Sequence, residues 1–208
     1  TTFICPAPVF PNGADEAPAV HDGVAFPVFV DGIFTNGDVE TQFPYEKEKT
    51  FKLASRPSAT KTIYLDYDGY HSVNNLWQHN IVFPAFSLDG DTSNFSDDEL
   101  QRIQYHFIEV VEDYLPFDIN VTTKDPGLAA LTKSNPADTT WGIRSVNTNQ
   151  TFGDPAGGFC YIGSFDDFED NPCYVFFPDL WAGLVNSHEI GHSLGLIHDS
   201  LNGTPPQA

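Results

Sequence analysis

The chain has 208 residues and carries 9 Lys and Arg against 29 Asp and Glu, a net charge of −20. Such a surface repels phosphate backbones and anionic lipids, so we expect no nucleic-acid partner. No apolar run approaches the roughly 18 residues that a membrane helix needs, and we expect no membrane insertion. The length suits one domain with a small appendage.

Residues 1–57 are interpreted as a strand- and turn-rich N-terminal segment. Short β-like runs, VAFPVFV at 24–30 and KTFKLA at 49–54, are separated by Pro and Asn-Gly turns. SRPSAT at 55–60 then marks a junction. We therefore predict two parts: the segment 1–57, with a prosegment as one interpretation, and a domain at 58–208.

The domain is predicted to open with a strand and a long amphipathic helix. The strand is KTIYLD at 61–66, which runs into a Gly turn. Ser96 and Glu99 stand in capping-box spacing ahead of a helix that Pro116 ends. Its apolar positions recur at helical intervals: Ile103, Phe107, Val110, Val111 and Tyr114. This pattern predicts a helix with one buried face.

Four strands and a second helix complete the predicted order. The strands are DINVTT (118–123), TWGIRSVNT (140–148), GGFCYIGSF (157–165) and CYVFFPD (173–179). The stretch LWAGLVNSHEIGHSLG (180–195) is predicted to form a helix that Gly195 stops. Strand, helix, four strands and helix, without an internal repeat, indicate a mixed α/β fold.

The stretch HEIGHSLGLIHD at 188–199 has the spacing of a catalytic metal site. On a helix, His188 and His192 project from one face and can converge on an ion about 2.0–2.1 Å away, as zinc requires. Gly195 can turn the chain back, so that His198 arrives as a third ligand and one coordination position stays open. Glu189 can reach a metal-bound water without acting as a ligand. No Glu follows Glu189, which favours His198 as the third ligand. The alternative is a buried helix with chance histidines.

The three cysteines are Cys5, Cys160 and Cys173. Cys160 and Cys173 flank a polar loop between two apolar stretches, and we predict that they form a disulfide in an oxidising compartment. No C-x-x-C pair exists, so the cysteines do not form a zinc set. Cys5 is expected to be free or paired with another molecule; the alternative is a prosegment thiolate on the metal.

The stretch from His188 to Asp199 resembles the metzincin signature H-E-x-x-H-x-x-G-x-x-H-D, in its adamalysin- or reprolysin-type form. With KTIYLDYDG, YLPFDINVTT and GGFCYIGSF, it resembles secreted bacterial metzincin-like domains over about Ser58 to Asp199. The resemblance implies a mixed, mostly parallel twisted sheet with an antiparallel edge strand, a backing helix and an active-site helix. It also implies a secreted zinc endopeptidase that hydrolyses peptide or protein substrates with a zinc-activated water and Glu189 as general base.

The same resemblance makes GGFCYIGSF the edge strand that lines the substrate cleft. Main-chain groups of six residues would bind an extended peptide: Gly158, Phe159, Cys160, Tyr161, Ile162 and Gly163. The alternative is an ordinary edge strand without a ligand. Asp199 is either a carboxylate that holds the turn or a histidine in place, or a solvated acid at the helix end.

The chain departs from the family at its C-terminal end. Metzincins place a methionine in a tight turn beneath the zinc, whereas this sequence contains no Met and ends at Ala208. We therefore expect that the C-terminal subdomain is missing, either because the chain was cut or because a separate C-terminal fragment completes the site. The three zinc ligands are all present, so this departure bears on activity more than on zinc affinity. Two other functions stay open: a non-catalytic, zinc-stabilised interaction module and a latent precursor fragment blocked by residues 1–57.

Two acidic stretches, Asp89 to Glu99 and Asp166 to Asn171, have the oxygen content of calcium sites. Neither has EF-hand spacing. For the first we favour a turn and a helix cap, and Ca²⁺ is the alternative for either stretch.

Overall fold

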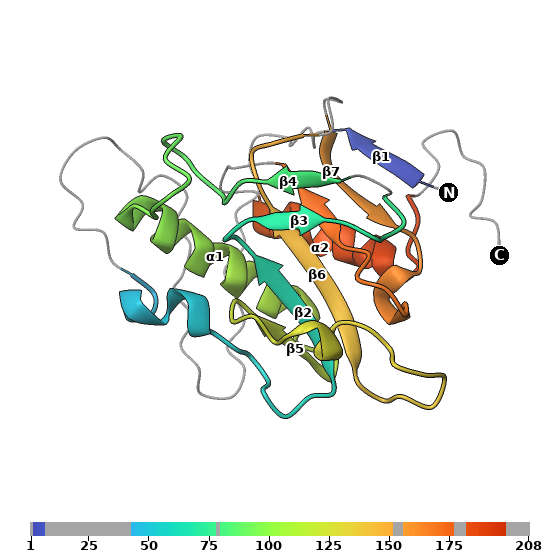
Figure 1. The fold of residues 1–208 in the computed structure, drawn as a ribbon. Helices are drawn as coiled ribbons and strands as arrows, with labels where there is room; N and C mark the ends of the chain where they lie inside the picture. The colour runs from blue at the N-terminus through green and yellow to red at the C-terminus, as the bar shows by residue number, and fades with distance from the viewer. Residues whose placement is uncertain (1, 7–42, 78–79, 152–155, 177–181, 199–208) are drawn as a thin grey trace.

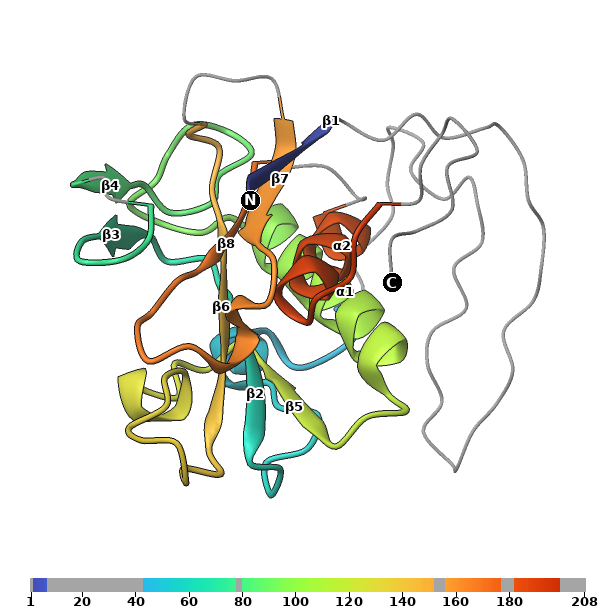
Figure 2. The same ribbon diagram turned by 90° about the vertical axis from the view of Figure 1, so that its right-hand side faces the viewer.

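The computed structural model describes residues 2–6, 43–77, 80–151, 156–176 and 182–198. A six-stranded sheet in the order β1-β7-β8-β6-β2-β5 forms its centre. Helices α1 (Asp97–Tyr114) and α2 (Ala182–Ser193) lie on one face of the sheet, and a two-stranded β3-β4 hairpin lies on the other (Figures 1 and 2). The predicted mixed α/β class is confirmed. None of the described helices is long and apolar enough to cross a membrane.

The sheet is mostly parallel, as predicted. Its parallel strands are β2 (Lys61–Asp66), β5 (Ile119–Thr122), β6 (Trp141–Asn147) and β8 (Cys173–Val175). Strand β7 (Ala156–Tyr161) runs antiparallel to β8, and β1 (Thr2–Pro6) pairs antiparallel with the other side of β7. The N-terminal strand therefore occupies the position outside β7.

Helix α1 begins as its sequence predicts. The Ser96 side chain accepts a hydrogen bond from the Glu99 amide, and the Glu99 carboxylate accepts one from the Ser96 amide. A second oxygen of Glu99 accepts the Leu88 amide at 2.6 Å, so this carboxylate also fixes the preceding loop. The buried face of α1 packs on apolar strand residues in the largest core cluster, among them Ile63, Leu65, Val121 and Ile143.

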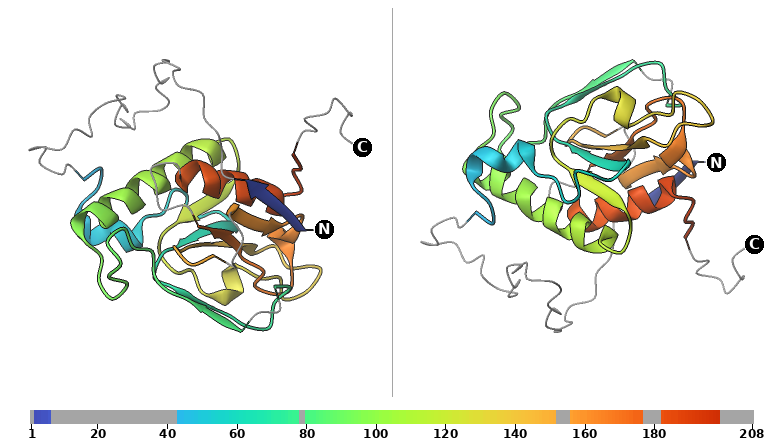
Figure 3. Two further views of the ribbon diagram at one scale, coloured as in Figure 1. Left: turned by 90° about the horizontal axis from the view of Figure 1, so that it is seen from above. Right: turned by 90° about the horizontal axis from the view of Figure 1, so that it is seen from below.

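The two helices lie next to each other on the same face of the sheet, as the views from above and below show (Figure 3). Their contact is close at Gly183 of α2, where an added Cβ would meet the carboxylate of Glu109. The Tyr114 hydroxyl at the end of α1 donates to the Ser187 carbonyl at 3.0 Å. This packing holds α2 in a fixed position behind β7 and β8.

The opposite face is covered by a hairpin that the sequence did not predict. Strands β3 (Tyr70–Ser72) and β4 (Ile81–Phe83) pair antiparallel. Beneath them a second apolar cluster joins Trp77 and Phe83 to Val146, Phe159, Tyr174 and Phe176 of the sheet and its ends. The Trp77 indole donates to the Pro172 carbonyl at 2.9 Å, which ties the hairpin loop to the β7–β8 connection.

Residues 43–57 pack against the domain. The prediction of a β-like run at KTFKLA was wrong, because Lys47–Lys52 forms a 3-10 helix, η1. Leu53 enters the main core, and its amide and carbonyl both bond to Thr123 beside β5. Tertiary contacts therefore override the local strand pattern.

The other predicted β-like run, VAFPVFV, lies outside the described residues. Two further 3-10 turns are η2 (Leu128–Ala130) and η3 (Ser164–Asp166).

Candidate metal centre

The end of α2 turns the chain back as its glycine predicts. Gly195 has a φ of +95°, in the left-handed region that favours glycine. Its amide donates to the His192 carbonyl at 2.9 Å, and the Leu196 amide donates to the Gly191 carbonyl at 3.0 Å. This is the hydrogen-bond pattern of a Schellman motif. It directs the following residues back beneath the helix, towards His188 and His192.

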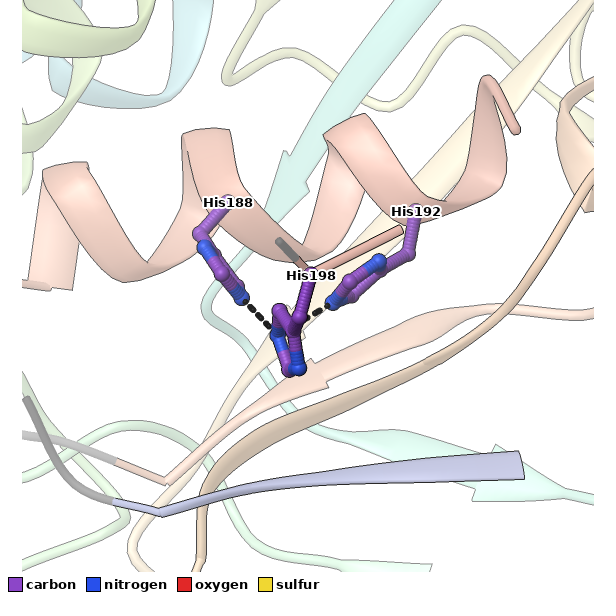
Figure 4. A group of neighbouring side chains, drawn as sticks. All are labelled: His188, His192 and His198. Carbon is purple, nitrogen blue, oxygen red and sulfur yellow. Dashed lines mark hydrogen bonds between the residues drawn. The ribbon is translucent and has the colours of Figure 1, made fainter. Parts of the chain in front are cut away.

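Three imidazoles meet at this turn (Figure 4). The Nε2 atom of His198 lies 2.9 Å from Nε2 of His188 and 3.1 Å from Nε2 of His192. In the part of the chain that the structure describes, these residues form the group of side chains that could hold a metal ion, with ligand atoms within 4.8 Å of one another. Two tetrahedral zinc ligands would lie about 3.3 Å apart, close to these spacings. The donor set therefore fits a metal ion.

Neighbouring groups orient the rings and lower the pKa of two of them. Nδ1 of His192 lies 2.8 Å from the Leu196 carbonyl, so this nitrogen donates to the carbonyl and Nε2 points towards His198. Burial, together with the nearby His192 and His198, lowers the pKa of His188 to about 4. Burial and His192 also lower the pKa of His198. His188 and His198 are therefore neutral at pH 7, the form that binds metal.

Helix α2 is tied to its neighbours at each turn that carries a candidate residue. The Gly163 amide donates to the His192 carbonyl at 3.0 Å, and the sulfur of Cys173 lies 3.5 Å from the Glu189 carbonyl. Asn186 is buried and bonds to Asn147 and Ser145 of β6. Such contacts on a rigid element keep a site in one geometry.

Glu189 lies on the side of α2 that faces β7. Its side chain is fully buried, at 0% exposure. The nearest backbone is that of Gly158, where an ideal Cβ would lie 2.7 Å from Cγ of Glu189 and 2.8 Å from its Oε1. The structure therefore places the side chain of the predicted base against the strand predicted to line the cleft.

The predicted substrate strand is present, but β1 pairs with it. Gly158, Phe159, Cys160 and Tyr161 of β7 lie opposite Cys5, Ile4, Phe3 and Thr2. Ile162 and Gly163 follow the strand, and Gly163 makes the turn with a φ of +77°. The main-chain groups on this side of β7 are thus engaged by another extended segment of the same chain.

The predicted disulfide is confirmed between Cys160 and Cys173, with an S–S distance of 2.09 Å. It joins β7 to β8 beside the Phe159–Tyr174 pair of the sheet. Asp199 lies outside the described residues, and so does the side chain of Cys5.

The acidic stretches make turn and cap contacts. Asp89 accepts from the Ser87 hydroxyl at 3.1 Å and from the Asp91 amide at 2.8 Å, and Glu99 completes the cap of α1. In the described ranges neither stretch contributes to the group of metal-binding side chains found at the histidines. The preferred interpretation of Asp89 to Glu99, a turn and a helix cap, is confirmed.

Sequence reasoning missed the contacts that support the histidines, namely the Tyr114–Ser187, Gly163–His192 and Asn186–Asn147 bonds. No local pattern predicts them, because each joins separate elements.

A comparison with models of known protein families and a comparison with curated proteins found no match to the chain.

Proposed function

We propose that the protein is a zinc-dependent endopeptidase of metzincin type that works outside the cell. The observation that carries the proposal is the convergence of His188, His192 and His198 at one point, with Glu189 on the same helix. A structural site closes its coordination with four protein ligands, whereas three leave a position for water. A disulfide is compatible with an oxidising, extracellular setting.

Zinc is the metal we assign to this site. Imidazole nitrogens suit zinc, copper, iron and nickel, and a three-histidine set with one open position is a known catalytic zinc arrangement. Bound zinc would lower the pKa of a water molecule to near neutrality and polarise a carbonyl group.

Glu189 would perform the proton transfers. Its carboxylate would take a proton from the attacking water and pass it to the nitrogen of the leaving amine. The burial of Glu189 strengthens the electrostatic interactions of its carboxylate. The substrate would be an extended peptide that hydrogen-bonds to β7 as an added strand, in the place where β1 now lies.

The test compares the wild-type chain with Glu189→Gln. We expect purified wild type to hold one zinc per chain and to cleave an unfolded protein, with cleavage lost in a chelator. Glu189→Gln should keep the zinc and lose roughly 10²–10⁴-fold in turnover, the usual contribution of a general base. Equal turnover in the variant would refute the assigned role. Zinc binding without hydrolysis in the wild type would leave two explanations, the non-catalytic module and a site that lacks its C-terminal part, and hydrolysis restored by a C-terminal fragment would favour the second.

The pairing of β1 with β7 favours a second candidate, a latent form of the same enzyme. An edge already paired with β1 cannot bind a peptide in the same way. The matching variant removes residues 1–42 and keeps η1, since Leu53 belongs to the core. We expect at least tenfold faster cleavage from it. Unchanged turnover would exclude latency through β1.

A further inference from the structure

Gly158 occupies a strand position where its backbone conformation does not require glycine. Its φ lies outside the positive range, unlike those of Gly163 and Gly195. Glycine within a strand costs stability because it has no side chain to pack and loses more backbone entropy on folding. A glycine at such a position is therefore expected where another group approaches the backbone closely.

Two groups approach Gly158, the side chain of Glu189 and the main-chain carbonyl of Tyr174. An ideal Cβ on Gly158 would lie 2.7 Å from Cγ and 2.8 Å from Oε1 of Glu189, and 2.7 Å from the Tyr174 carbonyl oxygen. Carbon atoms that are not bonded meet at about 3.5–4.0 Å. Any larger residue at this position must therefore displace the Glu189 carboxylate or the strand.

The main chains of α2 and β7 are both held in place by hydrogen bonds or by the disulfide. Helix α2 is held on either side of Glu189, where the Tyr114 hydroxyl donates to the Ser187 carbonyl and the Gly163 amide donates to the His192 carbonyl. On the strand side, the Phe176 amide donates to the Gly157 carbonyl at 2.9 Å, and a disulfide joins β7 to β8 two residues beyond Gly158. The Glu189 side chain can rotate away from an added Cβ, whereas the Tyr174 carbonyl can move only with β8, so a larger residue at position 158 would displace the carboxylate and also strain the β7–β8 pairing.

We propose that Gly158 is a positioning residue whose missing side chain forms the recess that holds the Glu189 carboxylate. Strand β7 would then have two roles, since it binds the peptide through its main chain and sets the place of the general base. The catalytic part of this inference rests on the proposed function. The steric coupling between the two residues does not.

The first test is kinetic. Gly158→Ala should keep one zinc per chain and change KM less than threefold, because peptide binding uses main-chain groups, while kcat falls about 100-fold through misplacement of the base. Gly191→Ala on α2 is the matched control. Its Cβ would meet only Leu196 Cδ1, at 3.4 Å, an ordinary contact, so kcat should stay within twofold of wild type. An unchanged kcat in an active Gly158→Ala variant would overturn the proposal.

The second test needs no activity. Thermal unfolding of metal-free protein is measured for Gly158→Ala in the wild-type background and in a Glu189→Ala background, which lacks Cγ and Oε1. The fall in Tm caused by Gly158→Ala should be at most half as large in the second background, since only the Tyr174 contact remains. Failure of Gly158→Ala to fold in the wild-type background alone would also support the coupling. Equal falls in both backgrounds, or failure to fold in both, would overturn it even if the wild type proves to be a peptidase.

Discussion

Two clusters of ionisable side chains lie on opposite sides of the sheet, and they differ in how their charges are balanced. In the first, Nη1 of Arg144 lies 2.6 Å from Asp66 and Nε lies 2.9 Å from Asp170. The rings of Tyr64 and Tyr70 lie 5.1 and 4.9 Å from the guanidinium carbon. Opposite charges thus stabilise one another where water is largely excluded, since the side chains of Asp66 and Arg144 are 1% and 13% exposed.

The histidine cluster has the opposite character. His188, His192 and His198 repel one another when protonated, which contributes to the lowered pKa of His188. Two of these residues are exposed, and the group lies at the end of α2. The Arg144 cluster pairs opposite charges of its own and links β2 and β6 to the β7–β8 connection. The three histidines bring imidazole nitrogens close together, and a bound cation would stabilise this arrangement. Their arrangement therefore indicates binding, whereas the arrangement of the Arg144 cluster indicates structure.

The largest effect should follow from removal of a histidine. We expect His198→Ala to lower zinc affinity by more than about 100-fold, because even residues behind the ligands contribute factors of 10–100. Peptide hydrolysis should be lost with the metal. The metal-free protein should unfold within about 0.5 kcal/mol of wild type, since the side chain is exposed. Equilibrium dialysis with zinc and denaturant titration measure the two quantities. A large loss of metal-free stability would assign the histidines a structural role.

Removal of Arg144 should have the reverse effect, a loss of stability with unchanged zinc binding. Burial raises the pKa of Asp66 to about 7, so the comparison is made at pH 8, where the carboxyl is charged. There Arg144→Met leaves Asp66 and Asp170 without their counter-charge, and breaking a buried ion pair costs about 3–5 kcal/mol. Zinc stoichiometry should stay at the wild-type value. The control is a triple variant with Asp66→Asn and Asp170→Asn added, which should recover part of the loss because no buried charge remains uncompensated. If the single variant is as stable as wild type, the cluster does not hold the fold together.

Loss of the disulfide should rank next. The bond between Cys160 and Cys173 closes a loop with a sequence separation of 13, and such a cross-link contributes about 3 kcal/mol. We expect a double Cys→Ser variant to lose this stability and to match wild type measured in a reductant. Since the bond ties β7 to β8, zinc affinity should fall less than in His198→Ala. An unchanged free energy of unfolding would show that packing alone secures the two strands.

The fold and the ligand set could be predicted because their signals are local. Ser96 and Glu99 are three residues apart and form the predicted cap. The three histidines lie within one helix and its turn, so helix geometry and the positive φ of Gly195 suffice to bring them together. Strand β2 begins and ends at the predicted residues, since its apolar run is bounded by a Gly turn.

The remaining features depend on pairings between distant parts of the chain. Arg144 and Asp66 are 78 positions apart, and only the parallel register of β2 and β6 makes them neighbours. The strands β3 and β4 have three residues each, too few to show an alternating pattern. The close approach of Gly158 to Glu189 requires the crossing of α2 over β7. A glycine inside a strand pattern was the one available signal, and it does not identify the approaching group.

The smallest effect concerns a third kind of ionisable group, a largely buried carboxyl whose pKa is raised although the charge of Arg102 acts to lower it. Burial, with smaller contributions from the charges of Asp113 and Glu112, raises the pKa of Glu109 from an ordinary value of 4.5 to about 8. Between pH 4.5 and pH 8 the folded protein keeps a proton that the unfolded chain releases, so stability falls as pH rises through this range. Glu109→Gln stays neutral throughout, so its stability does not depend on pH through this side chain.

From pH 5 to pH 8 the stability of the variant relative to wild type should therefore rise by about 2 kcal/mol, less than the full pKa shift implies because water reaches part of the side chain. Denaturant titrations at the two pH values measure this difference. A pH-independent difference between the two proteins would mean that Glu109 is ionised in the folded state, and its place against Gly183 would then need a cationic partner.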